Sequence, residues 1–407
     1  DQSASANITL KYVRPDGTTA ATTSSSGIEA NGSLTFFGSS AGVTEGFNGA
    51  VVITSNTPIV VIANQLSQDT GQSGSYNGVS AVGKSVYVPA VQRGGEGGHT
   101  SLYIQNAGSA ATSRLSVKFF RVNESAPVLT RTLSAVPAGA AVELAQGGLT
   151  DLPDGFRGSA VVESDQDLAV VVNQSNGKSL LASSGRPTGS ASLYGPLVMN
   201  NNGGFNSAVQ VQNVGTAATP VTINVRNART GAALPAQTRT LAPGAATSGP
   251  MSELAGSDRL VGSVVVSAAS GGSIIGVVNQ VNAGSNQGSA YSLFSGGSSS
   301  LVAPLVQTAN SGWNSGFQVQ NIGTSNATVT LNVVDTGRNP VAVPDATQTL
   351  APGQSFTWFP ITSLGTRMVG AATVTGSEGS VLVGVANQLN QDAGAVDYFM
   401  TYEAVSQ

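Results

Sequence analysis

The 407-residue chain contains no cysteine and a single histidine, His99. Without cysteine there are no disulfides and no thiolate nucleophiles, and one imidazole excludes nearly every transition-metal site that needs more than carboxylates. A Ser-His-Asp triad would have to use this one histidine. We therefore expect a protein that is not an enzyme and that needs neither a cofactor nor a metal.

Charge is also scarce. Charged residues make up 9% of the chain, with only four lysines, and the formal net charge is −4, whereas an ordinary globular protein has roughly 25% charged residues. No basic surface is available to neutralise phosphates, so nucleic acid is excluded as an expected partner. No apolar run approaches the roughly 20 residues that span a bilayer, and the chain begins at Asp1 instead of a methionine. We expect a mature, secreted, soluble chain at the outside of the cell.

Glycine, in contrast, is abundant, with 51 residues, and the apolar fraction is 40%. Helices depend on Glu, Lys, Arg and Leu, so this composition favours many short strands joined by tight turns. An all-helical fold is excluded.

An internal repeat of about 107 residues organises the chain. A strand-like segment ending in Asn-Gln recurs at steps of 109, 106 and 108 residues, and a Gly-small-Val element precedes each copy. The Asn-Gln pairs begin at Asn64, Asn173, Asn279 and Asn387. Each later unit also carries a Leu-x-Pro-Gly turn or a variant of it, at Pro137, Pro243 and Pro352.

Two landmarks at the start of the unit occur only three times. The proline strand is found at Pro89, Pro196 and Pro304, and the Gln-Asn-x-Gly element at Gln105, Gln212 and Gln320. The first unit therefore lacks its first two strands. About seven period-2 strands per unit are typical of an immunoglobulin-like sandwich, so we predict an all-β fold of four tandem immunoglobulin-like β-sandwich domains, the first truncated. Their boundaries are residues 1–85, 86–192, 193–300 and 301–407.

Three motifs have both a functional and a structural interpretation. Gly78 to Ser85 matches the phosphate-binding pattern GxxxxGK[ST], but VYVPAV follows and cannot open the helix that a phosphate loop requires. His99 aligns with Phe205 and Trp313 of the next two units, which favours a packed ring over a general base. Asp69 and Asp392 follow the first and last Asn-Gln pairs in Gly-rich loops, but EF-hand spacing is missing, so we favour solvated loops over a calcium site.

The Asn-Gln and Gln-Asn pairs are the most faithful feature of the repeat. They could form a ladder of ligand-binding amides, for example for sugar, or tie strand ends and turns to neighbouring backbone. Their recurrence in every unit favours the structural role. Surface glycans are a further partner if the source modifies the Asn-x-Ser/Thr sequons at Asn7, Asn31, Asn123, Asn173 and Asn326.

The two ends of the chain carry the strongest functional signal. An incomplete first unit would present an open sheet edge that invites pairing with another chain. The last unit ends in an unusually aromatic tail, and we predict that residues 390–407 of one subunit complete the first domain of the next. The N-terminal strand is the alternative exchanged segment. The expected assembly interface comprises Tyr398, Phe399, Met400, Tyr402, Ala404 and Val405, or Ile8, Leu10 and Tyr12.

The repeat pattern SAVV…VVVNQ resembles tandem immunoglobulin-like proteins of prokaryotic cell surfaces, including pilus and filament subunits assembled by donor-strand complementation. The resemblance implies an extracellular structural or adhesive role. We expect a subunit of an extracellular filament or surface layer that binds copies of itself head to tail. The alternative is a cell-surface adhesin or carbohydrate-binding tandem array, which would expose aromatic residues at the same position in each unit.

Overall fold

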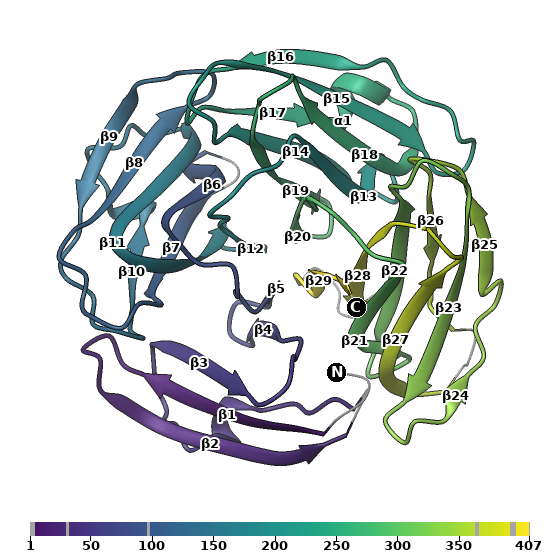
Figure 1. The fold of residues 1–407 in the computed structure, drawn as a ribbon, viewed down its shortest axis with the longest axis horizontal. Helices are drawn as coiled ribbons and strands as arrows, with labels where there is room; N and C mark the ends of the chain where they lie inside the picture. The colour runs from purple at the N-terminus through teal and green to yellow at the C-terminus, as the bar shows by residue number, and fades with distance from the viewer. Residues whose placement is uncertain (1–4, 30–31, 96–97, 363–365, 391–395, 407) are drawn as a thin grey trace.

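The protein is an all-β chain whose antiparallel sheets pair into sandwich-like units. The computed structural model describes residues 5–29, 32–95, 98–362, 366–390 and 396–406. The units follow one another around a circle, and the last strands of the chain return to the first unit (Figure 1). The predicted all-β class is confirmed.

The first repeat, residues 1–85, forms two small sheets. One has the order β2-β1-β3 and the other is the hairpin β4-β5. Their bounds are β1 Ala6–Val13, β2 Thr19–Ile28, β3 Ala50–Ser55, β4 Ile62–Ser67 and β5 Gln72–Asn77, with a 3-10 turn η1 at Gly38–Ser40. The alternation of Ile8, Leu10 and Tyr12 buries one face of β1 beneath Phe36, Val43 and Phe47 of the loop that connects β2 to β3.

The second repeat forms one seven-stranded sheet because its longest strand, β11, runs through both halves of the sandwich. The order is β10-β7-β6-β11-β8-β9, with β12 also paired to β11. The bounds are β6 Gly83–Arg93, β7 His99–Asn106, β8 Leu115–Arg121, β9 Pro127–Thr132, β10 Ala141–Ala145, β11 Phe156–Ser175 and β12 Leu180–Ser184, with a 3-10 turn η2 at Gln146–Gly148.

The third repeat shows the complete unit as two four-stranded sheets, β13-β18-β15-β16 and β17-β14-β19-β20. The bounds are β13 Ser192–Asn200, β14 Asn206–Asn213, β15 Thr219–Asn227, β16 Gln237–Leu241, β17 Ala246–Pro250, α1 Met251–Ala255, β18 Leu260–Ala268, β19 Ile274–Asn282 and β20 Gln287–Ser292. Val209, Val264 and Val278 come from both sheets and are fully buried between them.

The fourth repeat pairs a six-stranded sheet, β24-β23-β27-β21-β30 with β25 on β23, with the four-stranded sheet β26-β22-β28-β29. The bounds are β21 Ser300–Thr308, β22 Trp313–Asn321, β23 Ala327–Asp335, β24 Pro340–Val341, β25 Thr347–Leu350, β26 Ser355–Trp358, β27 Met368–Gly376, β28 Leu382–Asn390, β29 Phe399–Glu403 and β30 Val405–Ser406.

The proline strands β6, β13 and β21 tolerate proline because the ladder is interrupted there. The pairing register of each shifts beside its proline, at Pro89, Pro196 and Pro304. Proline cannot donate to a ladder, so it is confined to such bulges and to edges. The repeated proline therefore marks a repeated bulge.

Two strand positions have no occupant in the first repeat. In the third repeat β13 pairs with β18 and β14 pairs with β19, and the sequence alignment places β3 and β4 at the positions of β18 and β19. Among the described residues β3 has only β1 as a sheet neighbour and β4 only β5. Apolar surface is uncovered accordingly, because seven of the nine exposed large hydrophobic side chains in the described part of the chain lie in this repeat: Leu34, Phe37, Val51, Ile59, Val60, Leu66 and Val82.

The outer wall of the circle is held where the Pro-Gly turn of one repeat meets the preceding repeat. Ser159 Oγ donates to the Gly244 carbonyl at 2.7 Å, and Ser263 Oγ donates to the Gly353 carbonyl at 2.7 Å. The first repeat contains no Leu-x-Pro-Gly turn, so the fourth repeat has no such partner beyond it. Instead, Arg338 of the fourth repeat forms an exposed ion pair with Glu29.

Candidate functional site

The four repeats meet at the centre of the circle. In each repeat the strand that contains the Asn-Gln pair forms a hairpin with the next strand, and these second strands are β5, β12, β20 and β29. Strands β5 and β20 both pack against β12 and β29 (Figure 1). We call these four strands the central junction. It brings together the most repetitive residues of the sequence with the C-terminal tail.

The Asn-Gln pairs connect neighbouring repeats across the central junction. Asn173 Nδ2 donates to Gln65 Oε1 at 3.0 Å, and Asn279 Nδ2 donates to Gln174 Oε1 at 3.4 Å. Gln280 Nε2 donates to Thr401 Oγ1 at 3.2 Å. These amides are therefore used in contacts between repeats.

The Gln-Asn pairs hold the Pro-Gly turns inside the second, third and fourth repeats. Asn106, Asn213 and Asn321 are fully buried, and each Nδ2 donates to two backbone carbonyls while Oδ1 accepts a backbone N–H two residues ahead. The Gln105 and Gln212 amides donate to the turn carbonyls of Gly139 and Gly244. The structural interpretation of these pairs is confirmed.

Asp397 is the residue that joins most elements in the central junction. Its side chain is fully buried, with Oδ2 accepting the Leu180 N–H at 2.6 Å and Oδ1 accepting the Gly288 N–H at 2.7 Å. Its backbone N–H donates to the Gly71 carbonyl at 2.8 Å, and Ser73 Oγ donates to its carbonyl at 2.6 Å. One residue of the fourth repeat thus bonds to the first, second and third.

The ionisation of Asp397 is set by opposing effects. Burial disfavours the charged form, while hydrogen bonds from the backbone N–H groups of Gly288, Leu180 and Ser73 favour it. Burial prevails and raises the pKa of the Asp397 carboxyl to about 7. Sequence reasoning missed this residue, although an aspartate within the apolar and aromatic stretch AVDYFM was the available signal.

A second link joins the tail to the first repeat. Asn77 Nδ2 donates to the Glu403 carbonyl at 2.7 Å and Asn77 Oδ1 accepts the Glu403 N–H at 2.9 Å, while Glu403 Oε1 accepts the Ser292 N–H at 2.6 Å. We call the bonds of Gly71, Ser73 and Asn77 to Asp397 and Glu403 the closing contact.

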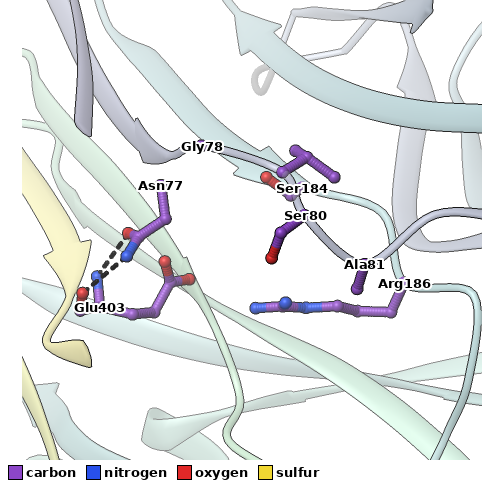
Figure 2. Close-up of a pocket in the computed structure, with 8 residues that line it drawn as sticks. Asn77, Gly78, Ser80, Ala81, Ser184, Arg186 and Glu403 are labelled. Carbon is purple, nitrogen blue, oxygen red and sulfur yellow. Dashed lines mark hydrogen bonds between the residues drawn. The ribbon is translucent and has the colours of Figure 1, made fainter. Parts of the chain in front are cut away.

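A small cavity lies beside the closing contact. It is lined by Asn77, Gly78, Val79, Ser80, Ala81, Ser184, Arg186 and Glu403, and Figure 2 shows the Arg186 guanidinium and the Glu403 side chain extending toward one another below Ser80. Its volume of ≈ 40 Å³ holds a few water molecules at about 10–15 Å³ each, and is much smaller than a nucleotide site.

The phosphate-loop match lines this cavity without forming a phosphate loop. The residues after Gly78 lead into strand β6, which begins at Gly83 and contains Lys84. A phosphate loop needs a following helix whose N-terminal N–H groups bind the phosphates. The expectation that this match carries no nucleotide chemistry agrees with the local structure.

A GxSxG pattern at residues 38–42, which the sequence reasoning overlooked, also lacks its structural context. It contains the 3-10 turn η1 and is followed by irregular chain. A nucleophile elbow requires a strand that turns sharply into a helix. The pattern therefore carries no catalytic assignment.

The aligned ring positions differ between repeats. Phe205 packs against Phe399 with centroids 4.9 Å apart, and Trp313 stacks on Tyr398 at 5.5 Å. His99 is exposed, and its Nδ1 accepts the Gly94 N–H at 3.1 Å. The packed-ring prediction holds for the two aromatic residues and is wrong for the histidine, which is exposed and belongs to no ring pair among the described residues.

The tail residues of the predicted assembly interface lie within their own chain. Strand β29 pairs with β28 in the register Leu389↔Phe399, and β30 pairs with β21. Phe399, Met400, Tyr402 and Ala404 are buried, whereas Tyr398 and Val405 are half-buried. Burial raises the pKa of the Tyr402 phenol well above its usual range, and the phenol Oη donates to the Leu305 carbonyl at 2.5 Å.

The alternative exchange strand is likewise occupied. Ile8, Leu10 and Tyr12 are buried, and β1 is the central strand of its sheet, paired with β2 and β3. The sequence predicted a contact between the tail of one copy and the first repeat of the next. In the structure the tail contacts the first repeat of its own chain. Exchange between copies stays a prediction.

The remaining sequence candidates are the loop aspartates and the glycosylation sequons. Asp69 is exposed, Asp392 lies outside the described residues, and no group of three His, Asp or Glu side chains that could hold a metal occurs in the described part of the chain. Of the sequons, Asn7, Asn123 and Asn326 are exposed, Asn173 is half-buried with its Nδ2 hydrogen-bonded to Gln65, and Asn31 is not among the described residues.

None of the helices in the described ranges has the length and apolar composition needed to cross a bilayer. No known family model matches the sequence, and no curated protein matches it either. The fold defines the class at a coarse level, as an all-β protein of several antiparallel sheets paired into sandwich-like units.

Proposed function

We propose that the protein is a non-enzymatic structural subunit of an extracellular filament or surface layer. In this proposal the sandwich-like units are four tandem immunoglobulin-like domains of about 107 residues, the first lacking two strands. The polar residues that recur most faithfully support a structural role, because they hold turns and neighbouring repeats rather than a cavity of substrate size.

The observation that carries the proposal is the closing contact. Asn77 and Glu403 bond to each other through two hydrogen bonds although they are 326 residues apart. Among the described residues, the ion pair that joins these two repeats is the exposed pair Arg338–Glu29, and exposed ion pairs contribute about 0–1 kcal/mol. On the inner side the closing contact adds its hydrogen bonds, and Ile62 packs against the apolar core of the fourth repeat.

A contact between the two ends of one chain can also form between two copies. If the circle opens there, the fourth repeat of one copy can bind the first repeat of the next through the same hydrogen bonds, as in domain swapping. The interface is heterologous, so it propagates head to tail into a filament or closes into a larger ring. Copies of the chain are the proposed partners.

Cysteine cross-linking tests this proposal, since the natural chain has no cysteine. The double variant Asn77→Cys/Glu403→Cys should form a disulfide within one chain in dilute solution, which is the control that the two positions are in range. An equimolar mixture of the two single variants should give disulfide-linked dimers at high protein concentration, and negative-stain images should show linear polymers.

The outcomes separate clearly. Cross-linked dimers of the mixed single variants together with linear polymers support exchange of the closing contact. If the double variant closes on itself while the mixed variants stay unlinked and monomeric at every concentration, the chain is a closed monomer and the proposed polymerisation is wrong.

A carbohydrate-binding array of identical sites is less well supported. That alternative expects aromatic residues exposed at one repeated position, whereas Phe205 and Trp313 pack on tail rings and His99 replaces them in the second repeat. The repeat therefore favours assembly over an array of equal binding sites.

A further inference from the structure

An open groove lies between the third and fourth repeats. Its volume is ≈ 890 Å³, within the roughly 300–1,000 Å³ typical of ligand sites. The third repeat contributes Asn202, Gly203, Phe205, Ala228, Arg229, Arg259 and Val261, and the fourth contributes Gln348, Gln354, Ser355, Phe356, Thr357, Phe359 and Leu389. Unlike the cavity in the central junction, this groove is large enough for several sugar rings.

One aromatic residue of the groove, Phe359, is not a requirement of the repeat. Strand register places Phe356 at the position of Thr247 in the third repeat, and Phe359 directly follows the strand residue that corresponds to Gly249. Pro250 of the third repeat therefore aligns with Phe359. Phe359 is 45% exposed. Phe356 is half-buried and packs edge-on against Trp358 with ring centroids 5.0 Å apart, so packing within the fourth repeat accounts for it. The third repeat folds the same sandwich with Pro250 in place of Phe359, so the exposed ring of Phe359 needs a reason other than folding.

The charge of the groove has one sign. Arg229 and Arg259 are exposed and line it, and no aspartate or glutamate belongs to the lining. Asn202 Oδ1 accepts hydrogen bonds from Arg259 Nε at 3.0 Å and from Nη2 at 2.8 Å, which holds that guanidinium in place. Among the described residues neither arginine forms an ion pair with a carboxylate.

We propose that this groove binds a segment of an acidic polysaccharide whose sugar rings carry carboxylates. The exposed face of Phe359 offers flat apolar surface to the C–H face of a sugar ring, as amphipathic aromatic sites do, and the half-buried Phe356 lines the same groove. The planar guanidinium groups match carboxylates in two-point geometry. The amides of Gln348 and Gln354 line the same groove and supply polar partners for hydroxyl groups.

Isothermal titration of the full chain with oligogalacturonate tests the site. The same oligosaccharide as its methyl ester keeps the rings and removes the charge, and inorganic polyphosphate supplies charge without sugar rings. We expect oligogalacturonate to bind and to weaken as salt is added, and both comparison ligands to bind at least about tenfold more weakly.

Two substitutions locate the binding. Phe359→Ala and Arg229→Gln should each weaken oligogalacturonate binding, the first by about tenfold, as expected for the loss of a central aromatic contact. Both side chains are exposed, so the thermal midpoint should change little. Phe37→Ala and Arg114→Gln are matched controls in other repeats, and they should leave binding unchanged.

Three results would overturn the proposal. The first is that oligogalacturonate gives no heat of binding. The second is that the methyl ester or polyphosphate binds as tightly as oligogalacturonate, and the third is that oligogalacturonate binds both groove variants as tightly as the natural chain. The second result would indicate a site that is selective for sugar faces alone or for charge alone, and the third would place the sugar elsewhere. None of these results depends on whether the protein polymerises.

Discussion

The buried carboxyl of Asp397 makes the stability of the protein depend on pH in a defined direction. Its pKa in the folded protein is raised from 3.8 to about 7. Between these values the folded chain keeps a proton that the unfolded chain has released, so the free energy of unfolding falls as pH rises. The stabilising contribution is fully present below about pH 4 and is lost as pH passes through about 7.

The magnitude follows from the size of the shift. A change from 3.8 to about 7 corresponds to about 4 kcal/mol at about 1.36 kcal/mol per pH unit. Asp397→Asn removes the titration but cannot accept both N–H groups of Leu180 and Gly288. The N–H of Leu180 or Gly288 then faces the amide NH₂ and loses its acceptor. This lowers the free energy of unfolding by about 1–3 kcal/mol, and the loss does not vary with pH.

The assay compares the thermal and urea unfolding of the natural chain and Asp397→Asn from pH 4 to pH 8. The natural chain should be the more stable at the acidic end and the less stable at pH 8, with the two curves crossing between about pH 4.5 and 6. Asp69→Asn changes an exposed aspartate and should follow the natural chain. A constant difference between natural chain and Asp397→Asn at all pH values would refute the reasoning, since it would mean that the hydrogen bonds outweigh burial and keep the carboxylate ionised.

Three further substitutions test the packing and the motif assignment. A Cβ at Gly158 would lie 1.8 Å from the Phe120 carbonyl oxygen, so Gly158→Ala should destabilise the chain by more than about 3 kcal/mol in urea unfolding; a change below about 1 kcal/mol would contradict the close packing. Tyr402→Phe leaves the Leu305 backbone without its hydroxyl partner and should cost about 1–3 kcal/mol by the same measurement, and an unchanged midpoint would mean that water replaces the bond. Adding magnesium ATP should change the melting temperature of neither the natural chain nor Lys84→Ala, because the GxxxxGK[ST] match runs into strand β6 and not into a helix. A rise in the melting temperature of the natural chain that Lys84→Ala abolishes would restore the nucleotide interpretation.

The repeat allowed the strand content and the incomplete first repeat to be predicted from sequence. Landmarks such as Pro196 and Gln212 occur in three copies only, and in the described part of the chain β3 and β4 lack the neighbours that those landmarks form elsewhere. Period-2 alternation in β1 likewise predicts which face is buried. These features depend on local pattern, which the sequence displays directly.

The closing of the circle was not predictable in the same way. The contacts between successive repeats do recur, as Ser159 to Gly244 and Ser263 to Gly353, but the sequence alone does not show that four such steps bring the last repeat back to the first. Asp397 differs from the residues at the equivalent positions of the other repeats, so alignment of the repeats does not single it out as a functional residue. The tail was recognised as unusual from its aromatic residues, yet its partner could equally be the same chain or another.

The closing contact links two parts of one covalent chain, and this has a consequence for how the protein responds to crowding. Binding within a chain competes with binding between chains through an effective concentration, which is on the order of millimolar for segments held close together. If the proposed exchange between copies takes place, each chain would satisfy its own contact at lower concentrations and remain single. Where chains are packed to a comparable local concentration, the same hydrogen bonds of Asn77 and Glu403 would be shared between neighbours with little change in energy. The density of the molecules, and no separate chemical signal, would then decide between isolated circles and a continuous layer.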